Sequence, residues 1–159
     1  MLALVAASYF PDITLTVAMT PSDFVWQGFM QGNKDGCKEW PIEGESTLSW
    51  HGKPLDYIPF VYKHPDYWKV IEQETKGTGN MLCSRKLFDD SEKAYNLTEK
   101  EMIKVENICG KLCLFGADDD TLWNTGKYIR RIDERLKKTP HKCDYEVIVY
   151  KIRHSFCVP

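Results

Sequence analysis

Apolar and polar side chains alternate along residues 13–19, whose sequence is ITLTVAM. This period of two is typical of a strand with one buried face. The preceding run at residues 2–10 is almost wholly apolar and β-prone, and Pro11-Asp12 supplies turn residues between the two runs. The pattern therefore predicts that the chain opens with two strands, and we interpret the apolar start as a strand rather than as a signal peptide.

The middle of the chain predicts three further elements. Residues 20–23 (TPSD) form a helix start, because a hydroxyl cap is followed by proline and an early acid, and the predicted helix ends at Gly32. A polar connection follows at residues 33–46. Residues 47–62 predict a hairpin with its turn at 51–54, and residues 64–75 predict a helix.

The second half alternates predicted strands and helices. Residues 80–88 and 111–115 predict strands, and residues 98–109 predict a helix that begins with a capping box. A stripe of apolar residues at a period of 3.6 then runs from Leu122 to Leu136 and predicts the longest helix. Residues 145–152 predict a closing strand.

This order of elements predicts a single domain over residues 1–159, of the α+β class, with a mixed and largely antiparallel sheet packed by about four helices. The alternative is a three-layer α/β fold, since the second half alternates strand and helix. If residues 111–115 form a strand, residues 116–122 become a strand-to-helix turn, which is the usual place for a ligand in such sheets.

Composition narrows the class of protein. Aromatic residues make up 13% of the chain, which argues against disorder. The formal net charge is −2, so no global field would recruit nucleic acid or an anionic membrane. No apolar run approaches the roughly 20 residues that span a bilayer. We expect no membrane association.

Cysteine content bears on the compartment. About 4% cysteine is well below the density of disulfide scaffolds, so we expect free thiols and a cytoplasmic protein. The alternative is a secreted protein with disulfides. The cysteines are Cys37, Cys83, Cys109, Cys113, Cys143 and Cys157.

Three consecutive acids, Asp118, Asp119 and Asp120, stand where the longest helix should begin. They suit capping and the positive end of the helix dipole. Their carboxylates are also candidate ligands for Mg²⁺ or Mn²⁺. We expect no bound cofactor or metal, with these three residues as the only weak candidates. Zinc is not expected, because the cysteine and histidine spacings do not converge on one centre.

The longest helix also has a basic side with aromatic neighbours. Such a face is a candidate contact for nucleic acid or phosphate. The alternative is a solvated face whose cations oppose the helix dipole. The residues are Lys127, Arg130, Arg131, Arg135, Trp123 and Tyr128.

A second candidate region gathers imidazoles and aromatic rings, which could form a cleft that stacks on a base or nucleotide. The alternative is ordinary core and rim. Its residues are Trp50, His51, Tyr57, His64 and Trp68, and His141 and His154 complete the histidines available for acid–base chemistry.

No catalytic motif stands out: the chain has no P-loop, no Gly-x-Ser-x-Gly and no His-Glu-x-x-His. The sequence therefore favours a non-catalytic binding or inhibitory module for a protein or nucleic-acid partner, of the kind found among viral and host-interaction proteins. The alternative is a small enzyme acting on a nucleotide or nucleic acid through the aromatic cleft or the acidic residues.

Overall fold

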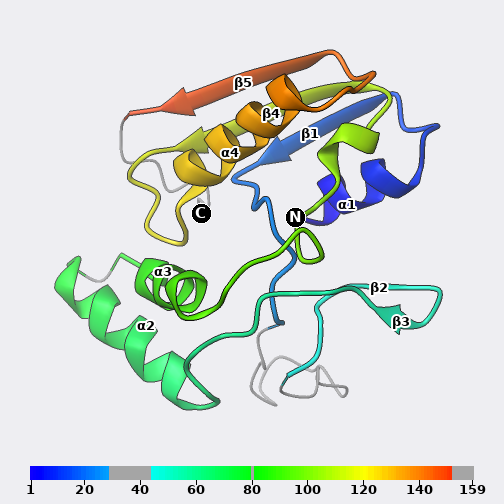
Figure 1. Cartoon of the computed structure of the whole chain (residues 1–159). Helices are drawn as coiled ribbons and strands as arrows, with labels where there is room; N and C mark the ends of the chain where they lie inside the picture. The colour runs from blue at the N-terminus through cyan, green and yellow to red at the C-terminus, as the bar shows by residue number, and fades with distance from the viewer. Residues whose placement is uncertain (29–43, 80, 152–159) are drawn as a thin grey trace, which may run out of the picture. The chain divides into compact units, whose positions relative to one another are not determined.

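The structure is a computed structural model that describes residues 1–28, 44–79 and 81–151. The chain divides into two compact units (Figure 1). The first contains Met1–Asp23 and Ile103–Pro159, and the second contains Phe24–Met102. Among the described residues, no helix has the length and apolar composition needed to cross a bilayer. The cellular compartment stays a prediction.

A three-stranded sheet forms the centre of the first unit, and all its strands are parallel. The expected largely antiparallel sheet is therefore wrong. The reason is the connection: a helix separates the last two strands and returns the chain to the same end of the sheet, so the next strand runs in the same direction. The strands, in the order in which they lie side by side, are β1 (Leu15–Met19), β4 (Lys111–Ala117) and β5 (Tyr145–Tyr150).

The crossover helix is α4 (Thr125–Lys138), which packs on β4 and β5 (Figure 1). Its apolar stripe is buried as the sequence predicts, with Ile129, Ile132 and Leu136 at 0 to 1% exposure. The helix begins at Thr125 and not directly after the three acids Asp118, Asp119 and Asp120, which were expected to mark its start. Its cap is Asn124, whose side chain accepts a hydrogen bond from the Lys127 amide at 3.3 Å.

The predicted opening strand is wrong, because residues 2–9 form the helix α1 (Leu2–Tyr9). A short apolar run has no period that separates a buried strand from a buried helix, and the three alanines in it favour the helix. Both α1 and α4 contact the short helix η2 (Val105–Asn107). Without an opening strand there is no opening hairpin, and this removes the main argument for an antiparallel sheet.

Burial alternates along β1 because helices cover one face of the sheet. Thr16 and Ala18 are buried, whereas Leu15, Val17 and Met19 are 50 to 58% exposed. The three-layer alternative would cover these exposed residues with further helices. In the described part of the chain they are not covered.

The second unit contains a two-stranded hairpin of β2 (Ser49–Trp50) and β3 (Lys53–Pro54). A hairpin forms where the sequence predicts one, but its second strand, β3, lies within the predicted turn at residues 51–54. The predicted strand at residues 55–62 is wrong, because in this range only Ile58 makes an isolated bridge. His51 and Gly52 form its turn with φ of 48° and 75°. Two positive φ values in succession are what a tight hairpin turn of type I′ requires.

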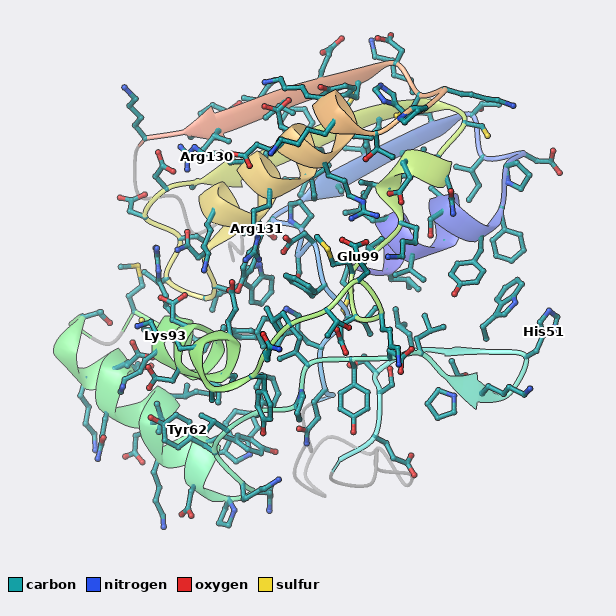
Figure 2. All side chains as sticks on the ribbon, viewed as in Figure 1. His51, Tyr62, Lys93, Glu99, Arg130 and Arg131 are labelled. Atoms are coloured by element: carbon teal, nitrogen blue, oxygen red, sulfur yellow. The ribbon has the colours of Figure 1, made fainter. Side chains whose placement is uncertain are left out.

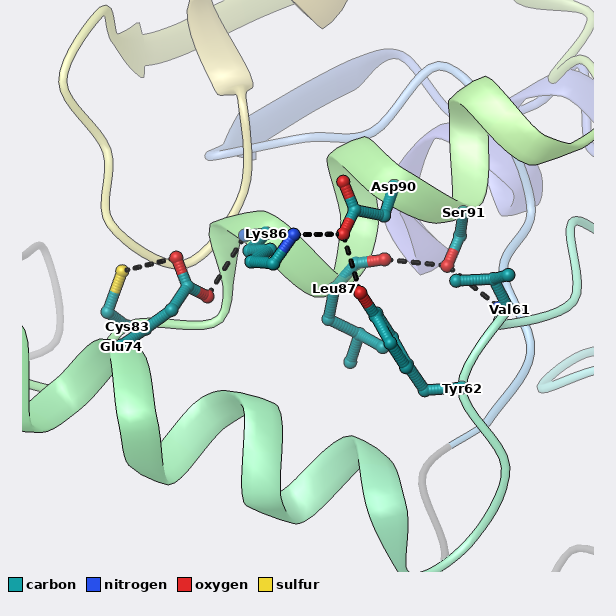
Figure 3. A network of polar contacts seen from close by, with 8 residues as sticks. All are labelled: Val61, Tyr62, Glu74, Cys83, Lys86, Leu87, Asp90 and Ser91. Atoms are coloured by element: carbon teal, nitrogen blue, oxygen red, sulfur yellow. Dashed lines mark hydrogen bonds and ion pairs between the residues drawn. The ribbon is translucent and has the colours of Figure 1, made fainter.

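Two helices complete the second unit: α2 (Asp66–Gly77) and α3 (Arg85–Ala94). The helix predicted at residues 64–75 is confirmed as α2. The strand predicted at residues 80–88 is wrong, because α3 begins at Arg85, inside this range. Hydrogen bonds fix α3 to the preceding chain (Figure 3). The buried Ser91 hydroxyl accepts from the Val61 amide at 3.0 Å, and Asp90 accepts from the Tyr62 hydroxyl at 2.7 Å.

Two other predicted helices are also wrong. Residues 24–27 form isolated bridges with distant segments, and Trp26 packs with Phe60 and Phe88 in an aromatic core. These tertiary contacts override the local helix signal. At Thr98 the backbone amide does donate to the Glu101 carboxylate, at 2.9 Å, as in a capping box, but no α-helix follows it. The predicted loop at residues 33–46 lies mostly outside the described residues.

Candidate functional site

The carboxyl ends of three parallel strands meet at one edge of the sheet in the first unit, the usual location of ligand sites in α/β folds. Thr20 follows β1, and its amide donates to the Phe115 carbonyl of β4 at 2.7 Å. Asp118 follows β4, and its amide donates to the Tyr150 carbonyl of β5 at 2.9 Å. Backbone contacts thus connect the segments that leave the three strands, and we examine this edge as the candidate site.

Thr20 has a backbone conformation that β-branched residues rarely adopt, with φ of 47°. Its carbonyl accepts a hydrogen bond from the indole N–H of Trp123 at 3.0 Å. This contact links the segment after β1 to the segment after β4. Strained residues held by their surroundings are common at functional sites, which supports the choice of this edge.

The acidic turn, defined as Asp118, Asp119 and Asp120, stands at the centre of the edge. Asp118 forms a two-pronged ion pair with Arg130 of α4, at 2.7 Å and 2.9 Å. The pair approaches the helix closely because Gly126 has no side chain, and a Cβ there would overlap the Asp118 carboxylate. Asp118 therefore fixes the turn to α4.

Asp120 is 5% exposed and has a different set of contacts. One carboxylate oxygen accepts from the Leu122 amide at 2.9 Å, and the other accepts from the Thr125 hydroxyl at 3.1 Å. Asp119 lies between these two anchored neighbours and is half-buried. The described residues contain no group of three histidine, cysteine or acidic side chains that could hold a metal ion.

The predicted basic face of α4, which carries Arg130 and Arg131 (Figure 2), consists largely of ion pairs. Besides Arg130, Arg131 lies 2.6 Å from the buried Asp23, and Arg135 lies 2.6 Å from Glu106. Lys127 is exposed, whereas Tyr128 is fully buried. These arginines hold the first unit together, and a contact with nucleic acid stays a prediction.

The predicted aromatic and histidine cleft is distributed over two elements of the second unit. Trp50 and His51 belong to the β2–β3 hairpin and are in edge contact, with ring centroids 4.4 Å apart. Figure 2 shows His51 at the end of this hairpin. His64 and Trp68 belong to the start of α2, and each contacts Tyr67, at 5.5 Å and 5.1 Å. Tyr57 lies between the hairpin and α2 in the sequence, and its side chain is half-buried.

The described cysteines are free thiols, and Cys37 and Cys157 lie outside the described residues. Burial raises the pKa of the Cys83 thiol, and it does the same for Cys143. A raised pKa lowers the thiolate fraction and with it the reactivity of the sulfur. The four free cysteines are Cys83, Cys109, Cys113 and Cys143.

Comparison with family models matches residues 1–154 to the family described as "BAAT / Acyl-CoA thioester hydrolase C terminal". The chain belongs to this family. No curated protein matches the chain. Membership of the acyl-CoA thioester hydrolase family overturns the expectation of a non-catalytic binding or inhibitory module. It gives no support to a viral or host-interaction protein.

Sequence reasoning singled out the three residues of the acidic turn as helix caps or as candidate metal ligands. It missed Thr20 and Thr125, because their roles depend on contacts with distant residues. One signal was available: a β-prone run at residues 111–115, followed by acids and then a helix, indicates a strand-to-helix turn of the kind that carries functional residues.

Proposed function

We propose that this chain acts in the hydrolysis of acyl-CoA thioesters, and that the acidic turn supplies the acid of its catalytic machinery. The observation that carries the proposal is the position of the turn, at the carboxyl end of a parallel strand and before a helix, in a chain that belongs to a thioester hydrolase family. His154 follows the end of β5 in the sequence. The chain order of acid and then histidine is that of α/β-hydrolases.

The chemistry requires a base as well as an acid. A histidine removes the proton from the group that attacks the thioester carbonyl and then delivers it to the departing CoA thiolate. A carboxylate beside the histidine holds its tautomer and orientation and stabilises the imidazolium. We assign the base to His154, which lies outside the described residues, on its place in the sequence.

We assign the acid to Asp119. Asp119 stands between two anchored residues: Asp118 is paired with Arg130, and Asp120 accepts hydrogen bonds from Leu122 and Thr125. Asp119 is half-buried at the middle of the turn. The sequence has no Gly-x-Ser-x-Gly motif, so we assign the acid and the base and not the attacking group.

A titration tests this pair independently of turnover. The imidazole of His154 is followed by NMR across pH in the wild-type chain, with Asp119→Asn as the variant, Asp144→Asn as the control outside the acidic turn, and His154→Gln to assign the signal. Loss of a neighbouring carboxylate disfavours the imidazolium, so Asp119→Asn should lower the titration midpoint by about one pH unit. An unchanged midpoint contradicts the assignment.

Hydrolysis itself is measured as release of free CoA thiol from acyl-CoA. We expect Asp119→Asn to lower kcat by roughly 10³-fold or more, as removal of the acid does in related triads. Asp144→Asn should retain most of the rate, because the Asp144 side chain lies outside the acidic turn and is 81% exposed. Equal losses in the two variants would contradict a specific role for Asp119.

A further inference from the structure

Thr125, the first residue of α4, is completely buried beneath the end of β4. Its hydroxyl accepts a hydrogen bond from the Ala117 amide at 3.0 Å. The same hydroxyl lies within donating distance of two acceptors, the Ala117 carbonyl at 3.0 Å and the Asp120 carboxylate at 3.1 Å. One side chain thus contacts both the last residue of the strand and the last residue of the acidic turn.

A hydroxyl has only one hydrogen to donate, so the two acceptors compete for it. An ionised carboxylate is the stronger acceptor, and the carboxylate of Asp120 is accordingly the partner that the hydroxyl favours. The Ala117 amide fills one of the acceptor positions on the same oxygen. The hydroxyl therefore joins strand, turn and helix through a single buried oxygen.

We propose that Thr125 is a positioning residue for the acidic turn, whose hydroxyl holds the Ala117 backbone before Asp119 and the Asp120 carboxylate after it. This inference rests on the proposed function, in which Asp119 is the acid. Ala117 and Asp120, the two residues that Thr125 contacts, lie on opposite sides of Asp118 and Asp119 in the chain. Holding both limits the freedom of the residues between them.

The surroundings of Thr125 leave it little room to move. A Cβ added to Gly116 would lie 3.1 Å from the Thr125 hydroxyl oxygen and closer still to Ile129, so β4 and the start of α4 are in close contact. Trp123 adds a second attachment through Thr20 at 3.0 Å. Catalytic groups must be held within a fraction of an ångström of their productive geometry, and a buried, close-packed hydroxyl provides such a restraint.

The hydroxyl and the methyl group of Thr125 can be tested separately. Thr125→Val keeps the volume and removes the hydroxyl, whereas Thr125→Ser keeps the hydroxyl and removes the methyl group. Thr139→Val, at the other end of α4, is the matched control. Thermal unfolding of each variant reports its stability, and Thr125→Ala is a second hydroxyl-free variant if the valine variant does not fold.

The readout is the NMR titration of His154, compared with wild type and with Asp119→Asn. We expect Thr125→Val to move the midpoint more than half of the way to the Asp119→Asn value, and Thr125→Ser and Thr139→Val to leave it at the wild-type value. A hydroxyl-free variant that is less stable but titrates as wild type would overturn the positioning role, as would a serine variant that behaves like the valine variant.

The same experiment separates this inference from the proposed function. If Asp119→Asn leaves the midpoint unchanged, the pairing of Asp119 with His154 is wrong, and Thr125 has no acid to position. If Asp119→Asn lowers the midpoint and Thr125→Val does not, the pairing holds and only the role of Thr125 is wrong.

Discussion

Arg135 of α4 holds the carboxylate of Glu106 in η2 through two hydrogen bonds, from Nε at 2.7 Å and from Nη2 at 2.6 Å. Both side chains are only 15% exposed. Fork-shaped pairing of this kind is stronger than a single charged contact. It fastens η2 to α4 across 29 positions of sequence.

Glu106→Gln should destabilise the protein, because it leaves the guanidinium of Arg135 largely buried without a counter-charge. The expected loss is about 2 kcal/mol, between the values for exposed and fully buried pairs. Chemical denaturation measures it. In contrast, Glu72→Gln breaks a pair with Lys76 that is 65 to 68% exposed, and it should leave stability nearly unchanged, because solvent screens exposed ion pairs. Equal costs in the two variants would show that burial of the Glu106 pair contributes nothing.

The same pair makes stability depend on pH. The hydrogen bond from Arg135 holds the pKa of Glu106 below its ordinary value of 4.5. A lowered pKa means that the unfolded chain takes up the proton first, so the stabilisation is present above pH 4.5 and is lost as pH falls through the folded-state pKa. The gap in unfolding free energy between wild type and Glu106→Gln should therefore narrow on acidification below pH 4.5. A gap that is constant with pH would contradict this.

Gly126→Ala should destabilise the protein, although alanine is normally the better residue in a helix. The added Cβ would overlap the Asp118 carboxylate and lie 3.1 Å from Arg130, which displaces the ion pair at the acidic turn. We expect a loss of about 1 to 3 kcal/mol, the usual cost of overpacking. The matched control is Gly77→Ala at the end of α2, where no atom lies within 4 Å of the added Cβ. That variant should be neutral or slightly stabilising.

Ile132→Asp should be severe, because Ile132 is 1% exposed on the apolar stripe of α4. A buried carboxylate without a partner costs several kcal/mol, and we expect loss of cooperative thermal unfolding. Glu134→Asp on the exposed side of the same helix is the control and should change stability by less than about 0.5 kcal/mol. An Ile132→Asp variant with the wild-type melting temperature would contradict the burial of this stripe.

The sequence by itself predicted those elements whose pattern is strong and local. The long apolar stripe became α4, the alternating run became β1, and the runs at residues 111–115 and 145–152 became β4 and β5. It also placed the acidic turn between a strand and a helix. Each of these needs only a hydrophobic period and a boundary signal, and both are properties of neighbouring residues.

Only the tertiary structure decided how these elements pair and what the polar residues do. Residues 2–9 are helical because a short apolar run fits either structure until its neighbours are known. The strands are parallel because a helix crosses between β4 and β5. Arg131 pairs with Asp23, 108 positions away, and the hydroxyl of Thr125 reaches Ala117 and Asp120. The hydrophobic period gave the buried face of α4 but not that of β1, where Thr16 and Ala18 are buried and the larger apolar side chains are exposed. The buried face of a strand and the partner of a charge or hydroxyl both depend on which distant segment packs against it.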